Sequence, residues 1–135
     1  MNLDRALANA PDPALARTAW ERVCEDPAAR EILERPIVAP VAIQLLGFSQ
    51  TAADFLVKYP EEAGMFATVT PRSRANLDQE VAGDVERLGP EPGLRRFRRR
   101  AMLRVATRDL AGASLDEVVH EITDIADACW ATAVT

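Results

Sequence analysis

Hydrophobic positions along this chain recur with the spacing of an α-helix. Almost no stretch alternates apolar and polar residues, whereas apolar residues repeatedly return after three or four positions. Asp12-Pro13 and Asp26-Pro27 each combine an N-cap residue with a proline at the first helical position. The pattern predicts helices over 13–25, 27–34, 37–48, 49–59, 71–88, 93–111 and 115–134, and a short helical turn near 61–66.

These elements predict an all-α fold of about seven or eight helices, compact enough for a single domain covering 1–135. Segment 37–48 is apolar almost throughout apart from Gln44, so we place it at the centre of the core. The last two helices are separated by only a few residues around Gly112. So short a connection between amphipathic helices predicts an antiparallel helical hairpin.

The final helix has a well-defined start and a broad apolar arc. Ser114 and Glu117 form a capping box, in which each side chain bonds a free backbone N–H of the other residue. Spacing residues 100° apart gathers into one arc Leu115, Val118, Val119, Ile122, Ile125, Ala126, Cys129, Trp130 and Ala133. The residues expected to be buried together are Leu115, Ile122 and Trp130 from this helix and Phe97 and Val105 from the preceding one.

The preceding helix holds seven arginines within 94–108, and the net charge over 93–112 is +6, from those seven arginines minus Asp109. The candidate interaction or structural cluster consists of Arg96, Arg100 and Arg104 on one polar arc and Arg98, Arg108 and Asp109 within the apolar arc. Because an unpaired buried charge is costly, we expect carboxylates to meet Arg98 and Arg108 and an arginine to meet Asp109. The alternative is a site for phosphate or an anionic partner, which guanidinium groups bind in bidentate fashion.

Composition argues against two classes of partner. The 16 basic and 21 acidic residues give a net charge of −5, which disfavours nucleic acid, and Phe97 is the only aromatic residue among the arginines. No run approaches the roughly 18–20 apolar residues of a membrane helix, and the first residues lack the basic start and apolar core of a signal peptide. We expect a cytoplasmic protein that binds neither nucleic acid nor membrane.

Few residues suit metal binding or catalysis. Cys24 and Cys129 lie in helical apolar patterns and are expected to pack as free thiols, and His120 is the only histidine, so no zinc or iron ligand set exists. On the polar face of the last helix, a solvated His120 is favoured over a general base, and a solvated acidic surface is favoured over a cation site at Asp124 and Asp127. We therefore predict no catalytic, cofactor-binding or metal-binding residue in this chain.

Three stretches of this sequence resemble segments of one known protein family. The longest is the arginine-rich Leu94-Arg95-Arg96-Phe97-Arg98-Arg99-Arg100-Ala101-Met102-Leu103-Arg104-Val105-Ala106-Thr107-Arg108-Asp109-Leu110-Ala111-Gly112. The others are Leu45-Leu46-Gly47-Phe48-Ser49 with Phe55-Leu56 and Tyr59-Pro60-Glu61, and Ile122-Thr123-Asp124-Ile125-Ala126-Asp127-Ala128-Cys129. In this order they resemble the bacterial glutamate–ammonia-ligase adenylyltransferase family over about residues 40–134.

The resemblance implies a role in controlling glutamine synthetase. In the family, an N-terminal half removes AMP from a tyrosine by phosphorolysis and a C-terminal half attaches AMP from ATP, both with magnesium. The family's Gly-Gly-x-Leu and Ser-Asp-x-Asp elements do not occur in this sequence. The resemblance thus implies a non-catalytic helical part of the adenylyl-removing half, with no cofactor of its own.

Its implied partners are the remainder of the adenylyltransferase, which uses Mg and ATP/ADP, and glutamine synthetase. One alternative is a stand-alone helical protein-interaction module without enzymatic activity. A small enzyme built on His120 and its acidic neighbours would require a pocket that the sequence does not indicate.

Overall fold

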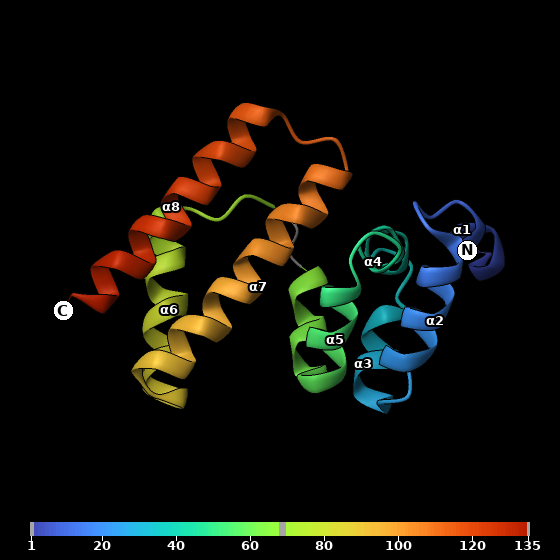
Figure 1. The fold of residues 1–135 in the computed structure, drawn as a ribbon, viewed down its shortest axis with the longest axis horizontal. Helices are drawn as coiled ribbons and strands as arrows, with labels where there is room; N and C mark the ends of the chain where they lie inside the picture. Colours follow the sequence, from blue (N-terminus) through green and yellow to red (C-terminus); the bar gives the residue numbers. More distant parts are fainter. Residues whose placement is uncertain (1, 68–69, 135) are drawn as a thin grey trace. The chain divides into compact units, whose positions relative to one another are not determined.

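The chain is mostly helical in the part that the computed structural model describes, residues 2–67 and 70–134, and no strand occurs there (Figure 1). The all-α prediction is therefore confirmed. In chain order the elements are α1 (Leu3–Ala8), α2 (Pro13–Val23), α3 (Pro27–Leu33), α4 (Ala39–Leu46), α5 (Gln50–Lys58), the 3₁₀ helix η1 (Pro60–Ala67), α6 (Arg74–Leu88), α7 (Pro90–Leu110) and α8 (Leu115–Ala133).

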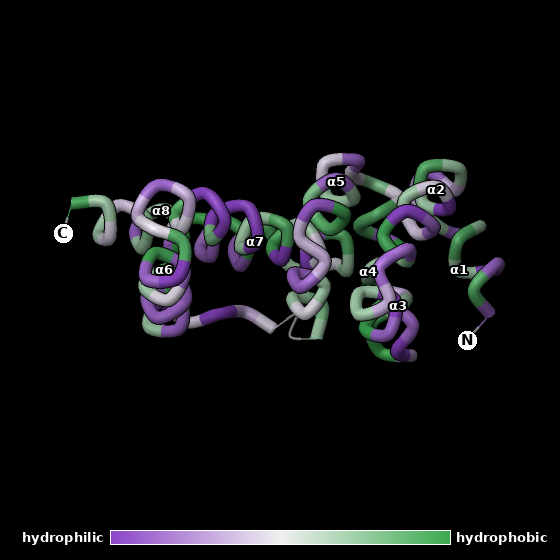
Figure 2. The backbone as a smooth tube through the Cα atoms, turned by 90° about the horizontal axis from the view of Figure 1, so that it is seen from below, coloured by the Kyte–Doolittle hydropathy of each residue, from purple (hydrophilic) through white to green (hydrophobic). Residues whose placement is uncertain are grey.

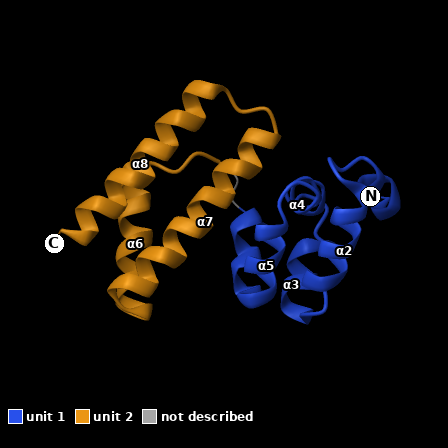
Figure 3. Cartoon of the chain, viewed as in Figure 1, with its two compact units in different colours: residues 1–69 blue, residues 70–135 orange. Residues whose placement is uncertain are grey.

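Contacts divide the chain into two compact units, residues 1–69 and 70–135 (Figure 3). The single domain predicted over 1–135 thus contains two such units. Among the residues that are described, no helix is both long enough and apolar enough to cross a membrane.

In the first unit, three helices begin at the N-cap residues that the sequence indicates. Asp12, Asp26 and Ser49 each accept a hydrogen bond from the backbone N–H three residues further on, and so begin α2, α3 and α5. The core of this unit is built from aliphatic side chains that are almost wholly buried: Leu7, Leu33, Ile43, Leu45, Leu46 and Leu56. The central apolar segment therefore occupies the core of the first unit, as its composition indicates.

Two details of the first unit differ from the prediction. Segment 37–48 forms a shorter helix, α4, because a hydrogen-bonded turn from Arg35 to Val38 precedes it and Gly47 ends it. Ile37 and Phe48, outside the helix, are consequently exposed. Helix α1 is an addition that the sequence pattern did not indicate, since it comprises only six residues.

The second unit is a bundle of three helices, in which α7 and α8 form the predicted antiparallel hairpin (Figure 1). Gly112 lies in their connection with φ of 100°, a left-handed conformation that suits glycine. The core of the bundle consists of Leu77, Val81, Phe97, Ala101, Val105, Val118, Ile125 and Ala128. Burial of Phe97 and Val105 is confirmed.

The junction between α6 and α7 is tighter than predicted. Helix α7 begins at Pro90, directly after Gly89, and not at 93, because a proline in the first turn of a helix loses no hydrogen bond. Gly93 is therefore a buried helical residue. A Cβ atom at Gly93 would lie 2.6 Å from the Cα of Val85, so glycine allows the backbones of α6 and α7 to approach closely.

The start of α6 also differs from the prediction of 71–88. Ser73 accepts a hydrogen bond from the backbone N–H of Asn76 and caps the helix, which begins at Arg74. Thr70-Pro71 carries the same type of start signal, but the local serine cap is the one used.

Helix α8 turns a different face to the core from the one predicted. Its buried residues are Val118, Glu121, Ile125 and Ala128. The expected burial of Leu115, Ile122 and Trp130 is wrong, since all three are exposed. The apolar arc is wider than the surface that α6 and α7 cover, and Glu121 takes a buried position because an arginine of α7 pairs with it.

Candidate functional site

The arginines of α7 lie on several sides of a helix that is hydrophilic over much of its length (Figure 2). Arg104 and Arg108 are buried and Arg96 and Arg100 are partly buried, whereas Arg95, Arg98 and Arg99 are exposed. Asp109 is exposed as well. Arg98 and Asp109, which helical spacing places within the apolar arc, are exposed because the packed side of α7 is centred on Phe97, Ala101 and Arg108.

Arg104 binds a single carboxylate through both ends of its guanidinium group. Its Nη1 lies 2.9 Å from Oε1 of Glu80 and its Nη2 lies 2.8 Å from Oε2. Two more arginines approach the same carboxylate, with Nε of Arg72 3.2 Å from Oε2 and Nε of Arg100 3.4 Å from Oε1. Three positive charges therefore surround Glu80 of α6.

These charges change the acidity of Glu80. Burial by itself raises the pKa of this carboxyl group, but the hydrogen bonds from Arg104 and the charges of Arg104, Arg72 and Arg100 outweigh burial and lower the pKa. Glu80 is therefore ionised at neutral pH in the folded protein, and three arginines surround it. Such a carboxylate is poorly suited to accept a proton in catalysis.

Asp84, one helical turn after Glu80, continues the network. It is buried, and Arg100 pairs with its Oδ2 while Nη2 of Arg87 lies 3.0 Å from its Oδ1. Arg100 thus contacts two carboxylates of α6 at once. These ion pairs hold the polar sides of α6 and α7 together next to the apolar core.

Arg108 makes the corresponding connection between α7 and α8. Its Nη1 contacts Oε2 of Glu121, and both side chains are almost completely buried. Glu117, which is exposed, lies 3.8 Å from Nη2 of the same guanidinium group. Arg100, Arg104 and Arg108 therefore each contact a carboxylate of α6 or α8.

The acidic face of α8 does not gather into a metal site. Oδ2 of Asp124 lies 3.4 Å from Nε2 of His120, while Oδ2 of Asp127 lies 3.8 Å from Nη1 of Arg74. Across residues 2–67 and 70–134, no three side chains of histidine, cysteine, aspartate or glutamate come together as metal ligands. The two carboxylates thus contact different side chains, the imidazole of His120 and the guanidinium group of Arg74.

Both cysteines are free thiols. Burial is the main cause that raises the pKa of Cys24 to about 11, and Glu34 adds to the rise. Burial also raises the pKa of Cys129, and the positive charge of Arg98 counteracts that rise. A raised pKa keeps a thiol protonated and unreactive at neutral pH, so both residues have the character of small apolar groups.

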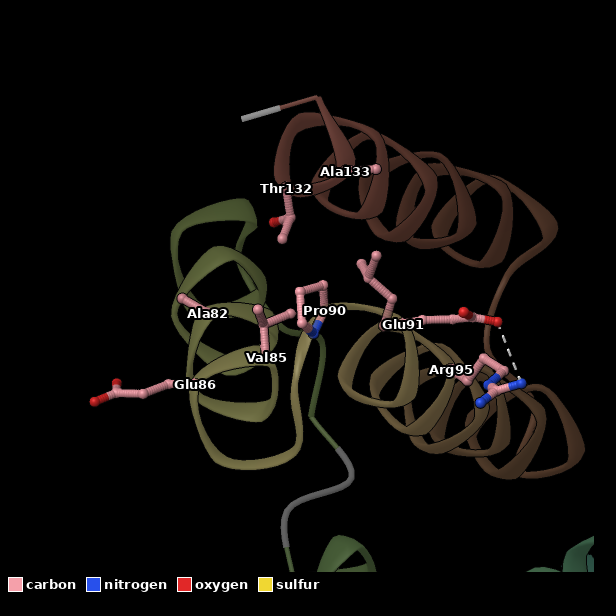
Figure 4. A pocket seen from close by; sticks show the side chains of 9 residues that line it. Ala82, Val85, Glu86, Pro90, Glu91, Arg95, Thr132 and Ala133 are labelled. Atoms are coloured by element: carbon pink, nitrogen blue, oxygen red, sulfur yellow. Dashed lines mark ion pairs between the residues drawn. The ribbon is translucent and has the colours of Figure 1, made fainter.

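A cavity of about 920 Å³ opens at one end of the second unit (Figure 4). The ends of all three helices line it, with Ala82 and Val85 from α6, Pro90 and Leu94 from α7 and Ala133 from α8. Charged residues stand at its edge, where Oε1 of Glu91 lies 3.6 Å from Nη1 of Arg95. Sequence reasoning missed this cavity, because it treated 90–93 as a break between helices.

An exposed apolar strip, here called the α8 stripe, runs along α8. It consists of Leu115, Val119, Ile122, Ala126 and Trp130. Leu115 is 77% exposed and Trp130 is 72% exposed. The signal for the stripe was present in the sequence as an apolar arc too wide for one packing surface.

Comparisons with known proteins agree with the motifs. The family model described as glutamate-ammonia ligase adenylyltransferase matches residues 41–135. A bifunctional glutamine synthetase adenylyltransferase/adenylyl-removing enzyme of Streptomyces avermitilis is 31% identical over 132 residues, which cover 91% of this chain and 13% of that protein. No solved structure was found to match.

The protein of the same description from Nitrosococcus oceani is 57% identical over 42 residues, which cover 30% of this chain and 4% of that protein. The chain thus spans only a small part of the length of either curated relative. The family model covers most of the chain, including the arginine-rich helix and the whole of α8. The chain therefore belongs to the glutamate-ammonia ligase adenylyltransferase family.

Proposed function

We propose that this chain is a non-catalytic helical part of the adenylyl-removing function of this family, and that it acts by packing against the catalytic remainder of the adenylyltransferase. In this function, inorganic phosphate attacks the phosphorus of the AMP group on an adenylylated tyrosine of glutamine synthetase, the bond to the tyrosine oxygen breaks, and ADP and the free tyrosine are released. Magnesium and the nucleotide belong to the catalytic remainder. Asp124 and Asp127, the nearest pair of carboxylates, do not suit a magnesium centre because they contact His120 and Arg74.

The observation that carries this proposal is the α8 stripe. A continuous row of exposed apolar residues on one side of a well-formed helix is typical of a surface that another polypeptide covers. The stripe lies within the region that the family model matches. The ion pairs of Glu80, Asp84 and Glu121 meanwhile serve to hold the three helices together. These features support a packing role better than a catalytic one.

The proposal is tested by complementation. The Streptomyces avermitilis relative is prepared without the segment that matches this chain, and circular dichroism and its adenylylation activity verify that the remaining protein is folded. We expect this truncated protein to lose phosphate-dependent release of ADP from adenylylated glutamine synthetase, and we expect added chain to restore part of it. Unimpaired activity of the truncated protein would contradict the proposal, and a deficit that the added chain leaves unchanged would favour a stand-alone interaction module.

A further inference from the structure

The α8 stripe leads into the cavity at the end of the second unit. Ala133, which lines the cavity, lies on the same side of α8 as Ala126 and Leu115, because seven and eighteen residues correspond closely to whole numbers of helical turns. The stripe and the cavity therefore form one apolar surface. Over the 19 residues of α8 this surface is roughly 28 Å long, at about 1.5 Å per residue.

A surface of this shape fits one additional helix. The second unit contains three helices, and the exposed large hydrophobic side chains found among its described residues all belong to α8 or to Val134, which follows it. A fourth helix laid along α8 would bury the stripe in the manner of a four-helix bundle. Its end would supply an apolar side chain to the cavity between Val85, Pro90 and Leu94.

The charge beside the stripe specifies the partner further. Arg95 lines the cavity together with Thr132 and Ala133, and Arg98 lies close enough to Cys129 to influence its thiol. Both arginines therefore border the end of the stripe on the α7 side. Within the described ranges Arg98 has no carboxylate partner, and Arg95 has only the exposed Glu91. An exposed cationic edge of this kind favours a partner with carboxylates along the facing edge.

We propose that the α8 stripe and its cavity bind an amphipathic helix from the remainder of the adenylyltransferase, apolar on one side and carrying acidic residues along the edge next to Arg95 and Arg98. This inference rests on the proposed function, and it assigns the contact to one surface and one kind of partner. The remainder is available in the relatives, since the match covers 13% of the Streptomyces avermitilis protein.

The two tryptophans allow a direct test. The chain is labelled with 5-fluorotryptophan, and its two fluorine NMR signals are assigned with Trp130→Phe. Trp130 lies on the stripe, whereas Trp20 is buried in the first unit and acts as an internal control. Addition of the truncated Streptomyces avermitilis protein should shift the Trp130 signal and leave the Trp20 signal in place.

Substitutions then locate the surface. Val119→Asp places a charge in the stripe, and Ile37→Asp, at an exposed apolar residue of the first unit, is the matched control. We expect Val119→Asp to weaken binding at least about tenfold, as the loss of a central interface contact does, and Ile37→Asp to leave the affinity unchanged. Circular dichroism verifies that both variants are folded.

The charge of the partner is tested with two synthetic helical peptides of 19 residues, the length of α8. Both peptides have the same apolar face of leucine residues. Along one edge of this face, one peptide carries glutamates and the other carries lysines. The unmodified chain should bind the glutamate peptide more tightly, and Arg98→Glu should abolish or reverse this preference. Equal binding of the two peptides, or a preference that Arg98→Glu leaves intact, would refute the inference that the partner helix is acidic along this edge.

The outcomes separate this inference from the proposed function. Binding of the truncated relative that Val119→Asp does not weaken would refute the role of the stripe and leave the proposed function standing. Absence of binding by the unmodified chain would refute both. If the Trp130 signal shifts with the concentration of the chain alone, and sedimentation shows a dimer that Val119→Asp dissociates, the occupant is a second copy and the proposed partner is wrong.

Discussion

Arg104 donates a hydrogen bond from each Nη atom to Glu80, at 2.9 Å and 2.8 Å from the two carboxylate oxygens, and so connects α7 to α6. The Arg104 side chain is almost completely buried, and that of Glu80 is 18% exposed. A guanidinium group buried in this way depends on its carboxylate, because the desolvation of the cation is otherwise uncompensated. The arginine-rich helix thus owes part of its stability to the acidic residues of α6.

Glu80→Gln should therefore destabilise the protein. The substitution keeps the shape of the side chain but leaves Arg104, Arg100 and Arg72 without the charge that they share. We expect a loss of about 3 kcal/mol in the free energy of unfolding, as for a buried pair that loses one partner. Urea denaturation at pH 7 measures it, and Glu86→Gln, at an exposed position of α6, serves as the control.

The same carboxylate predicts a pH dependence. The pKa of Glu80 is lowered in the folded state, because its arginine partners outweigh the effect of burial, so its contribution is present above the ordinary value of 4.5 and is lost as the pH falls through the folded-state pKa. The stability difference between the unmodified chain and Glu80→Gln should consequently shrink below pH 4.5. A constant difference from pH 7 down to pH 3 would show that Glu80 is not stabilised by its arginines.

Arg108 and Glu121 should behave as a coupled pair. Arg108→Met leaves the buried Glu121 without this partner, and Glu121→Leu leaves the buried Arg108 with only the exposed Glu117. Each substitution should lower the free energy of unfolding by about 3–5 kcal/mol. The double variant should recover much of that loss, because an apolar pair of similar size has no charge to desolvate. A double-mutant cycle measured by urea denaturation checks this, and additive single losses would contradict the pairing.

Gly93 should not tolerate a side chain. In Gly93→Ala the new Cβ would approach the Cα of Val85 to 2.6 Å and the backbone oxygen of Asp84 to 2.7 Å, so α6 and α7 must separate. We expect a loss of about 1–3 kcal/mol, as for overpacking in a core.

Gly83 provides the matched control, since a Cβ there meets no other atom within 4 Å. Gly83→Ala should stabilise α6 by about 0.5–1 kcal/mol, because alanine is the better helix former. Thermal denaturation of the two variants should therefore move the midpoint in opposite directions, and equal effects would mean that α6 and α7 are not in close contact at Gly93.

Trp130 and Phe97 should differ sharply in their effect on stability. The exposure of Trp130 predicts that Trp130→Ala changes the free energy of unfolding of the isolated chain by less than about 0.5 kcal/mol. Phe97→Ala, at a fully buried residue, should cost about 3–5 kcal/mol. Denaturation midpoints compare the two variants. A large loss of stability in Trp130→Ala would show that the Trp130 side chain is buried in the core.

Local signals account for the part of this structure that was predictable. The N-caps at Asp12, Asp26 and Ser114 each accept a hydrogen bond from the backbone N–H three residues further on. Both partners therefore lie within one short stretch of sequence, where a local pattern reveals them. The hairpin around Gly112 likewise follows from a short connection. Neighbouring residues therefore suffice for the class of fold and most helix boundaries.

The faces of α7 and α8 could not be predicted in this way. Periodicity identifies an apolar arc, but the share of the arc that is covered depends on which helices arrive from elsewhere in the sequence. Glu121 is buried and Trp130 exposed because Arg108 and the position of α6 define the packed side. The cavity at Pro90 depends on the close approach at Gly93, a tertiary contact that no local pattern reveals.

In the proposed function, this chain contributes to the adenylyl-removing reaction only in association with a catalytic remainder. The most direct measurement is phosphate-dependent release of ADP from adenylylated glutamine synthetase, with magnesium, by the chain alone, and with the intact Streptomyces avermitilis relative as the positive control. We expect no release of ADP by the chain alone at any concentration. Release of ADP that disappears in the Asp124→Asn, Asp127→Asn double variant would contradict it, because the chain itself would then contain the catalytic carboxylates.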